Sequence, residues 1–342
     1  MNSKNILIKV SQLYKIFGDD DKSALDLVKN GMGKEELLEK SNCVLGLNNI
    51  NLNIYPKSIQ VIMGLSGSGK STLIRHINRL IEPTFGSITV DGEDVLKMSE
   101  LELRNFRRSK TAMVFQRFAL LPHKTVLQNT VFGLHIQNRN PEEAKKIALR
   151  WIERVGLSGY EDKYPQHLSG GMQQRVGLAR ALTNDGDILL MDEAFSALDP
   201  LIRKDMQDIL LELQAELHKT VIFITHDLDE ALKIGDRIAI LKDGIMDQEG
   251  IPAEILLTPQ TQYVKDFVED VNRARVIKAK HIMSEINGQD ISNAMVVNQD
   301  DFIDRFIDKV ISEKPNCIIV KDKQDKNVGY LSSTRLAEVL KR

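Results

Sequence analysis

Residues 64–72 read GLSGSGKST, which sets three glycines and several hydroxyl side chains around one lysine. They follow the apolar run 59–63 and precede a segment of helical character, the context that a G-x-x-x-x-G-K-[ST] phosphate loop requires. Glycines let successive backbone N–H groups turn toward an anion, and the helix N-terminus adds the positive end of its dipole. The loop residues expected to bind nucleotide phosphates are Gly64, Ser66, Gly67, Ser68, Gly69, Lys70, Ser71 and Thr72.

Two acidic residues end another apolar run. The segment ILLM at 188–191 has the composition of a buried strand, and Asp192 and Glu193 follow it directly. In a phosphate loop of this type the lysine, here Lys70, contacts the β- and γ-phosphates, and the hydroxyl of Ser71 ligates Mg²⁺. Beside such a loop, Asp192 is expected as a Mg²⁺ ligand and Glu193 as the general base for the attacking water.

Gln116 and His226 also end apolar runs, VFQ and VIFITH. The Gln116 side chain can touch the metal or the water, and a neutral imidazole at His226 can hydrogen-bond near the γ-phosphate. Taken alone, a histidine at this place is more often a buried core histidine. Because the carboxyl ends of parallel strands meet at one edge of an α/β sheet, these strand ends predict a single catalytic crevice.

A second serine- and glycine-containing segment, LSGGMQQR at 168–175, also precedes a helix and predicts another anion-binding helix N-terminus. One bound nucleotide needs only one such site. If the second site covers the nucleotide of a partner subunit, the chain works as a two-fold dimer with two nucleotides at its interface.

Composition limits the remaining functions. The 342 residues are 42% apolar, enough for a large core, and the formal charge of −2 favours no nucleic-acid partner. Cys43 and Cys317 fit no metal or redox spacing, which predicts reduced thiols and a cytosolic location. The start of the sequence lacks the apolar core of a signal peptide, and no uncharged apolar run is long enough to span a bilayer, so any membrane role is expected to be peripheral.

The order of apolar runs predicts the architecture. Short continuous runs alternate with helical stretches from residue 61 onward, as in a parallel α/β sheet, and a charged stretch at 19–42 predicts a helical insertion, with a solvated loop as the alternative. The sequence changes character after Asp270 and resumes a β-α-β rhythm without a nucleotide motif. We predict a domain boundary there, with a helical subdomain at about 100–185.

Together, GLSGSGKS, Gln116, LSGGMQQR, ILLMDE, SALD and His226 resemble, in that order, the ATPase subunit of an ABC transporter over most of residues 6–260. The resemblance implies a P-loop NTPase ABC cassette with a RecA-like core, an antiparallel β subdomain and a helical signature subdomain. It implies Mg-ATP as the cofactor and an adenine-stacking aromatic, for which Phe17 is the candidate and Tyr14 the reserve. The other residues it implies at the nucleotide, some across the dimer, are Gln116, Ser169, Gly170, Gly171, Gln173 and Asp199.

Longer stretches, including LYKIFG, RHINRLIEPTFGSI and DILLMDEAFSALDPLIR, are similar to the glycine betaine/proline-type importer ATPases of bacterial osmoprotection, which carry a helical insertion at this place. Residues 275–283 and 316–342 resemble the start and end of one cystathionine-β-synthase (CBS)-type repeat, where the family usually has two. This small α/β module at 271–342 is expected to regulate the cassette.

The resemblance implies transmembrane permease subunits as partners, an indirect link to a solute-binding protein, and a place on the cytoplasmic face of the membrane. The apolar residues at 118–122, directly after Gln116, are expected to form the coupling surface. Betaine, proline, choline and carnitine remain open as solutes. The alternatives are an importer ATPase for another solute and a soluble ABC ATPase, although the single uninterrupted cassette disfavours the translation and DNA-repair types.

Overall fold

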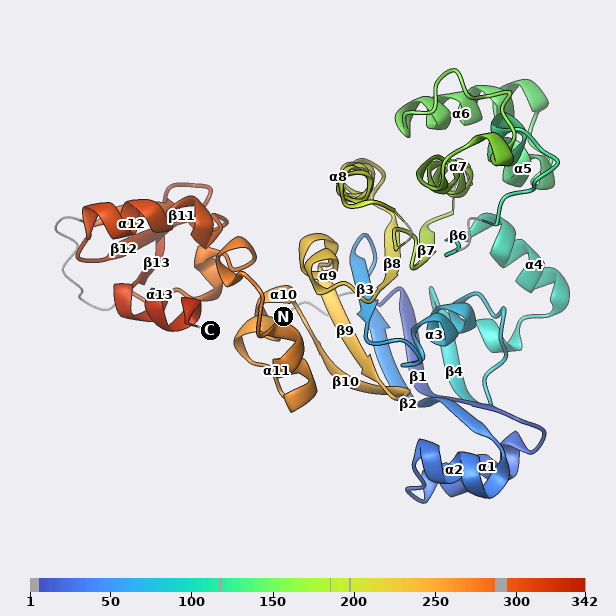
Figure 1. Cartoon of the computed structure of the whole chain (residues 1–342), viewed down its shortest axis with the longest axis horizontal. Helices are drawn as coiled ribbons and strands as arrows, with labels where there is room; N and C mark the ends of the chain where they lie inside the picture. The colour runs from blue at the N-terminus through green and yellow to red at the C-terminus, as the bar shows by residue number, and fades with distance from the viewer. Residues whose placement is uncertain (1–5, 117–118, 185, 197, 287–293, 342) are drawn as a thin grey trace. The chain divides into compact units, whose positions relative to one another are not determined.

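A computed structural model of the chain describes residues 6–116, 119–184, 186–196, 198–286 and 294–341 (Figure 1). The chain divides into two compact units, Met1–Asp247 and Gln248–Arg342. Among the described residues, the structure holds no helix with the length and apolar character needed to cross a membrane.

A six-stranded sheet forms the centre of the first unit. Its strands are ordered β10-β9-β3-β8-β7-β6, and the pairs β3–β8, β3–β9, β7–β8 and β6–β7 are parallel. The continuous apolar runs suit strands covered on both faces, and β3, β7 and β8 are buried along their whole length. The bounds are β3 Ile59–Met63, β6 Thr111–Val114, β7 Ile188–Asp192, β8 Thr220–Thr225, β9 Arg237–Lys242 and β10 Ile245–Gly250.

A second, antiparallel sheet has the order β2-β1-β4-β5. Helix α3 (Lys70–Ile77) buries Leu73, Ile74 and Ile77 in one apolar core together with residues of both sheets. The helix that carries the phosphate-loop lysine is therefore fixed by packing on both sides. The strand bounds are β1 Ile8–Phe17, β2 Val44–Ile54, β4 Phe85–Val90 and β5 Glu93–Asp94.

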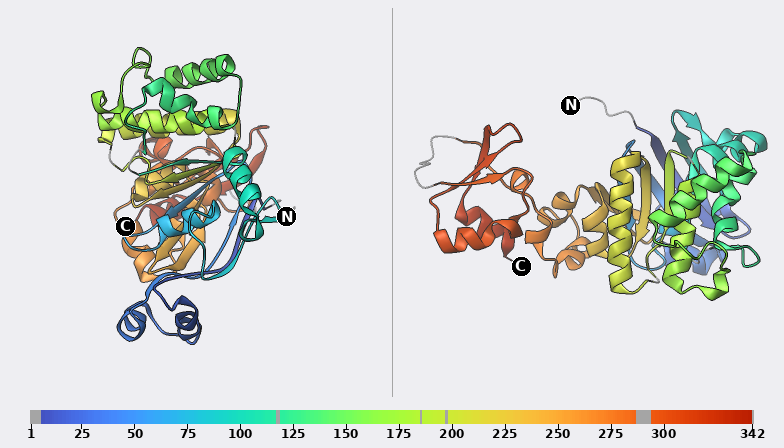
Figure 2. Two further views of the ribbon diagram at one scale, coloured as in Figure 1. Left: turned by 90° about the vertical axis from the view of Figure 1, so that its right-hand side faces the viewer. Right: turned by 90° about the horizontal axis from the view of Figure 1, so that it is seen from above.

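Helices α5, α6 and α7 pack against one another and form a layer of their own (green in Figure 2). Side-chain caps mark their starts: Thr125 and Gln128 form a capping box on α5, Asn140 caps α6, and Ser169 caps α7. The bounds of this region and its neighbours are η1 Val95–Lys97, α4 Glu100–Ser109, α5 Val126–Ile136, α6 Pro141–Arg154, η2 Pro165–His167, α7 Gly170–Thr183, α8 Pro200–Leu217 and α9 Leu228–Ile234. The predicted helical range of about 100–185 also contains β6, which belongs to the central sheet.

The stretch 19–42 forms two helices, α1 (Asp21–Lys29) and α2 (Lys34–Ser41), beside β1 and β2 (Figure 1). Leu25 and Leu37 enter a small apolar cluster with residues of both strands, whereas Leu38 is half exposed. The insertion is thereby anchored to the antiparallel sheet by its own core.

The second unit contains the three-stranded sheet β11-β12-β13 with helices α12 and α13, in the order β-α-β-β-α. This unit starts at Gln248, inside strand β10 and before the boundary expected at Asp270. Gln248 accepts a hydrogen bond from Gln260 N at 2.9 Å and donates one to Thr258 O at 3.2 Å. The bounds are α10 Pro252–Leu257, α11 Gln262–Val268, η3 Arg273–Arg275, η4 Ala279–His281, β11 Met295–Asn298, η5 Ile303–Arg305, α12 Ile307–Glu313, β12 Ile318–Lys321, β13 Asn327–Leu331 and α13 Ser333–Leu340.

Candidate active site

The loop between β3 and α3 is held by backbone from distant parts of the chain. A Cβ atom on Gly64 would lie 2.1 Å from Leu241 O, and one on Gly69 would lie 2.6 Å from Gly46 O. Both glycines also have positive φ values, 147° and 98°. Only glycine satisfies the backbone angles and the close approach together, so these positions keep the loop in the curled shape that presents N–H groups to an anion.

Lys70 is the first residue of α3 and is 5% exposed. Its ammonium donates to Gly64 O at 2.8 Å and Leu65 O at 2.9 Å, and lies 4.0 Å from Glu193 Oε1. Burial lowers the pKa of Lys70, while the nearby carboxylates of Glu193 and Asp192 act in the opposite direction. An anionic ligand would offset the cost of the buried charge.

Ser71 and Asp192 lie side by side, as the sequence predicts. Ser71 Oγ donates to Asp192 Oδ1 at 2.7 Å, and Arg75 Nη2 donates to Asp192 Oδ2 at 3.0 Å. Among the described residues, no group of three or more His, Cys, Asp or Glu side chains is placed to hold a metal ion by itself. The hydroxyl and carboxylate fit Mg²⁺, which usually takes one or two protein oxygens and completes its shell with phosphate and water.

Glu193 follows the buried strand β7 in a left-handed backbone conformation, with φ 47°. Gln116 Nε2 donates to Glu193 Oε2 at 2.6 Å, and Ser196 Oγ donates to Glu193 O at 3.0 Å. His226 Nδ1 lies 3.9 Å from Glu193 Oε1, too far for a hydrogen bond. The His226 side chain is exposed, which removes the alternative of a core histidine.

A cavity of about 430 Å³ runs from the phosphate loop to an aromatic side chain at the end of β1. Phe17 lines it with an exposed fraction of 40%, whereas Tyr14 is 9% exposed and packs edge-on against Phe85. Phe17 is therefore the aromatic that a base can reach. The cavity lining consists of Phe17, Lys34, Val44, Leu45, Gly46, Ser66, Gly67, Gly69, Lys70, Ser71, Thr72, Gln116 and Glu193.

The second serine–glycine segment is not part of this cavity lining. Ser169 Oγ accepts a hydrogen bond from Met172 N at 3.3 Å, and Gly170 is exposed at the start of α7. Gln173 turns inward and donates to Pro165 O and Leu168 O. Asp199 caps α8 by accepting from Ile202 N at 3.0 Å. The start of α7 is therefore exposed and lies outside the lining of the cavity in its own chain.

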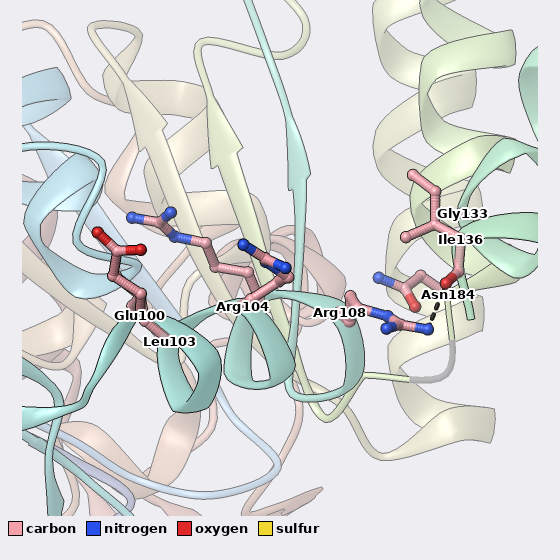
Figure 3. A pocket seen from close by; sticks show the side chains of 8 residues that line it. Glu100, Leu103, Arg104, Arg108, Gly133, Ile136 and Asn184 are labelled. Carbon is pink, nitrogen blue, oxygen red and sulfur yellow. Dashed lines mark hydrogen bonds between the residues drawn. The ribbon is translucent and has the colours of Figure 1, made fainter. Parts of the chain in front are cut away.

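A hollow of about 460 Å³ lies between α4 and the C-terminal end of α5 (Figure 3). Helix α4 contributes Glu100, Leu103, Arg104, Arg107 and Arg108, and the opposite side contributes Gly133, Ile136 and Asn184. Arg107 and Arg108 donate to backbone carbonyls, whereas Arg104 is exposed. The hollow combines positive charge with apolar side chains.

Sequence reasoning missed two basic residues of the site: Lys34, which lines the cavity, and Arg75, which contacts Asp192. Arg75 stands four positions after Ser71 on α3, so helical spacing places it on the same face and next to Asp192. Lys34 comes from the insertion, and its place in the cavity has no signal in the local sequence.

A family profile described as "ABC transporter" matches residues 47–196. The glycine betaine transport ATP-binding protein OpuAA of Bacillus subtilis is 57% identical over 283 residues, which are 83% of this chain and 68% of that protein. The chain belongs to the ABC transporter ATP-binding family. It is therefore an ATP-binding ATPase of a transport system, as the motifs predict.

Two further relatives of the ABC family extend the comparison. The trimethylamine N-oxide transport system ATP-binding protein TmoW of Pelagibacter ubique is 44% identical over 330 residues, covering 96% of both chains. A solved ATP-binding cassette, dimeric in a post-hydrolysis state with ADP and phosphate, matches 72% of this chain and 98% of its own, with a TM-score of 0.62 and 34% identity. The ABC cassette fold predicted from the sequence is thus confirmed.

Proposed function

We propose that this ABC ATPase powers the import of a quaternary-amine or related compatible solute, with glycine betaine and related betaines as the leading candidates and proline, choline and carnitine also open. The observation that carries the proposal is the 57% identity with OpuAA, a glycine betaine transport protein, over 83% of the chain. Trimethylamine N-oxide is the second candidate, because the match to TmoW extends over 96% of both chains.

Hydrolysis is assigned to the residues gathered at the strand ends. Lys70 and the phosphate-loop N–H groups bind the β- and γ-phosphates, and Glu193 takes a proton from the attacking water. Gln116 orients Glu193 through the 2.6 Å hydrogen bond, and His226 positions the water. Ser71, Asp192 and Gln116 would hold Mg²⁺, which neutralises charge on the phosphates when bound.

The proposed working form is a homodimer of cassettes. Ser169, Gly170, Gly171 and Gln173 stand at the start of α7, away from the cavity of their own chain, and Asp199 begins α8. In the dimer the start of α7 covers the γ-phosphate of the partner's nucleotide. The dimeric state of the similar solved cassette supports this arrangement.

The proposed partners are two permease subunits at the cytoplasmic face of the membrane, which connect the ATPase to a solute-binding protein. The surface that binds the permease is proposed to be the hollow of Figure 3 together with the loop after Gln116. Asn129 on α5 donates to Leu121 O and accepts from Leu121 N, so it joins the loop after Gln116 to the helix that lines the hollow. Phe118, predicted for the coupling surface, lies outside the described residues.

The second compact unit is proposed as a regulatory, CBS-like module. Its β-α-β-β-α order over β11 to α13 agrees with a single repeat of that type. The phosphate loop, Asp192 and Glu193 all lie in the first unit, so the second unit is expected to act on ATP hydrolysis without supplying these residues.

ATPase activity of the complex reconstituted with its permease and binding protein tests the solute. We expect glycine betaine to stimulate phosphate release and proline, choline, carnitine or trimethylamine N-oxide to do so less. Stronger stimulation by trimethylamine N-oxide would favour the second candidate. No stimulation by any of these solutes would refute the proposed class, while leaving the ATPase assignment intact.

A further inference from the structure

The insertion α1–α2 reaches the nucleotide cavity through a single side chain. Lys34, the first residue of α2, lines the cavity together with Phe17, Gly67 and Lys70. We propose that Lys34 is an additional nucleotide-binding residue, supplied by the insertion, whose ammonium contacts a phosphate oxygen of ATP.

The backbone at Lys34 is held in place from behind. Leu37, one turn further along α2, is fully buried in the cluster that the insertion forms with β1 and β2. Leu37 N also donates to Gly33 O at 2.9 Å. The Lys34 side chain therefore projects from a fixed helix start, so contact with a ligand costs little backbone conformational entropy.

The ammonium of Lys34 already meets the phosphate loop. Lys34 Nζ donates to Gly67 O at 3.3 Å and lies 4.0 Å from Asp243 Oδ1. An ammonium has three donors, and the contact with Asp243 is beyond hydrogen-bond length. With 35% of the side chain exposed, donors remain for an oxygen of a ligand in the cavity.

The position fits the phosphates better than the base. Gly67 belongs to the loop that presents N–H groups to the anion, and Phe17 lies at the adenine end of the same cavity. The Asp243 carboxylate is largely exposed, so solvent screens its pull on Lys34. A triphosphate in the cavity carries several negative charges and is less exposed than the Asp243 carboxylate, so it attracts the Lys34 ammonium more strongly.

The alternative is that Lys34 only braces the phosphate loop through Gly67. A brace acts through the shape of the phosphate loop, whereas a direct ion pair with phosphate weakens as salt is added. The salt dependence of Mg-ATP binding in wild type and Lys34→Gln, measured in competition with a fluorescent ATP analogue, therefore separates the two roles. Adenosine, which carries no phosphate, reports whether the base end of the cavity is intact.

The experiment compares full-length wild type with Lys34→Gln, Lys34→Arg and Lys40→Gln. Lys40 is the matched control, because it lies on the same helix but pairs with Glu36 at 2.6 Å. We expect Lys34→Gln to raise the dissociation constant of Mg-ATP by about 3- to 10-fold, as loss of a partly exposed charge contact typically does. Lys34→Arg should stay near wild type, and adenosine binding should not change.

Added salt should shrink the difference between wild type and Lys34→Gln, because it screens a contact of this exposure. The proposal is overturned if Lys34→Gln binds Mg-ATP like wild type, if Lys40→Gln weakens it equally, if adenosine binding weakens in parallel, or if added salt leaves the difference between wild type and Lys34→Gln unchanged. ATP binding is measured without any transported solute, so a failure of the proposed importer function would not produce these outcomes.

Discussion

At the residue scale, Glu193 holds a constrained position in the cavity. Its φ of 47° is unusual for a residue other than glycine, and hydrogen bonds from Gln116 and Ser196 hold its side chain and carbonyl. Strain of this kind persists only where surrounding contacts enforce it, and it is concentrated at functional sites.

Replacing Glu193 by Gln should remove the general base and preserve its shape. We expect ATP turnover to fall by about 10²- to 10⁴-fold, while ATP binding stays near wild type because Lys70 and the loop remain. Phosphate release and equilibrium ATP binding measure the two effects. Glu143→Gln, at an exposed position of α6, serves as the control; wild-type turnover in Glu193→Gln would exclude Glu193 as the base.

Phe17 and Tyr14 should respond in opposite ways to truncation. Phe17→Ala is expected to weaken ATP binding by about 1–3 kcal/mol, the usual value of base–aromatic stacking, with little change in the free energy of unfolding. Tyr14→Ala should lower the free energy of unfolding by about 3 kcal/mol, because it empties a buried aromatic site. Chemical denaturation and ATP titration of both variants decide between them, and the reverse pattern would make Tyr14 the stacking residue.

The sequence predicted the residues whose role follows from a local pattern. Lys70 and Ser71 belong to one continuous motif, and Asp192 ends a strand that had to run beside it. Lys34 could not be predicted, because its neighbour Gly67 is 33 positions away and the approach depends on how the insertion packs. The sequence already placed Phe17 before Tyr14, and the exposure of each ring supports that order.

At the element scale, α5 lies between Glu193, the proposed general base, and the surface hollow. Gln116 contacts Glu193, Asn129 of α5 holds Leu121 by hydrogen bonds, and the other end of α5 supplies Gly133 and Ile136 to the hollow. We expect a partner seated in the hollow to act on Gln116 through this helix.

Arg104→Glu should remove the net positive charge of the hollow, whose lining also holds Glu100, Arg107 and Arg108, without touching the ATP site. We expect basal ATPase to be unchanged and the affinity for the permease to fall by more than about tenfold, as for a central interface arginine. Copurification with the permease and solute uptake are the measurements. Lys146→Glu on the exposed face of α6 is the control; uptake at wild-type levels in Arg104→Glu would remove the hollow from the interface.

The presence of the central strands was easier to predict from the sequence than the boundary between the two units. Continuous apolar runs identified the central strands β3, β7 and β8 because both faces of these strands are covered. The unit boundary could not be placed from composition, because it falls inside β10 (Ile245–Gly250), where the sequence keeps the pattern of a strand.

At the scale of the whole molecule, the dimer can be tested at the start of α7. Ser169→Asp keeps a good helix cap but adds a negative charge, which should repel the γ-phosphate of the partner's ATP. On a Glu193→Gln background with Mg-ATP, we expect this variant to be monomeric by light scattering, whereas the neutral Ser169→Asn remains dimeric. Equal dimerisation of the two variants would contradict a role for Ser169 across the interface.

The phosphate loop is assembled from three regions that are far apart in the chain. Gly69 packs on Gly46, Gly64 packs on Leu241, and Gly244 N donates to Ser68 O at 3.1 Å. During synthesis the loop emerges long before the turn that closes it, so a nascent chain that ends ahead of Gly244 lacks part of the nucleotide pocket. ATP, which stabilises only states that bind it, can therefore favour late folding steps but gives no help to the early ones.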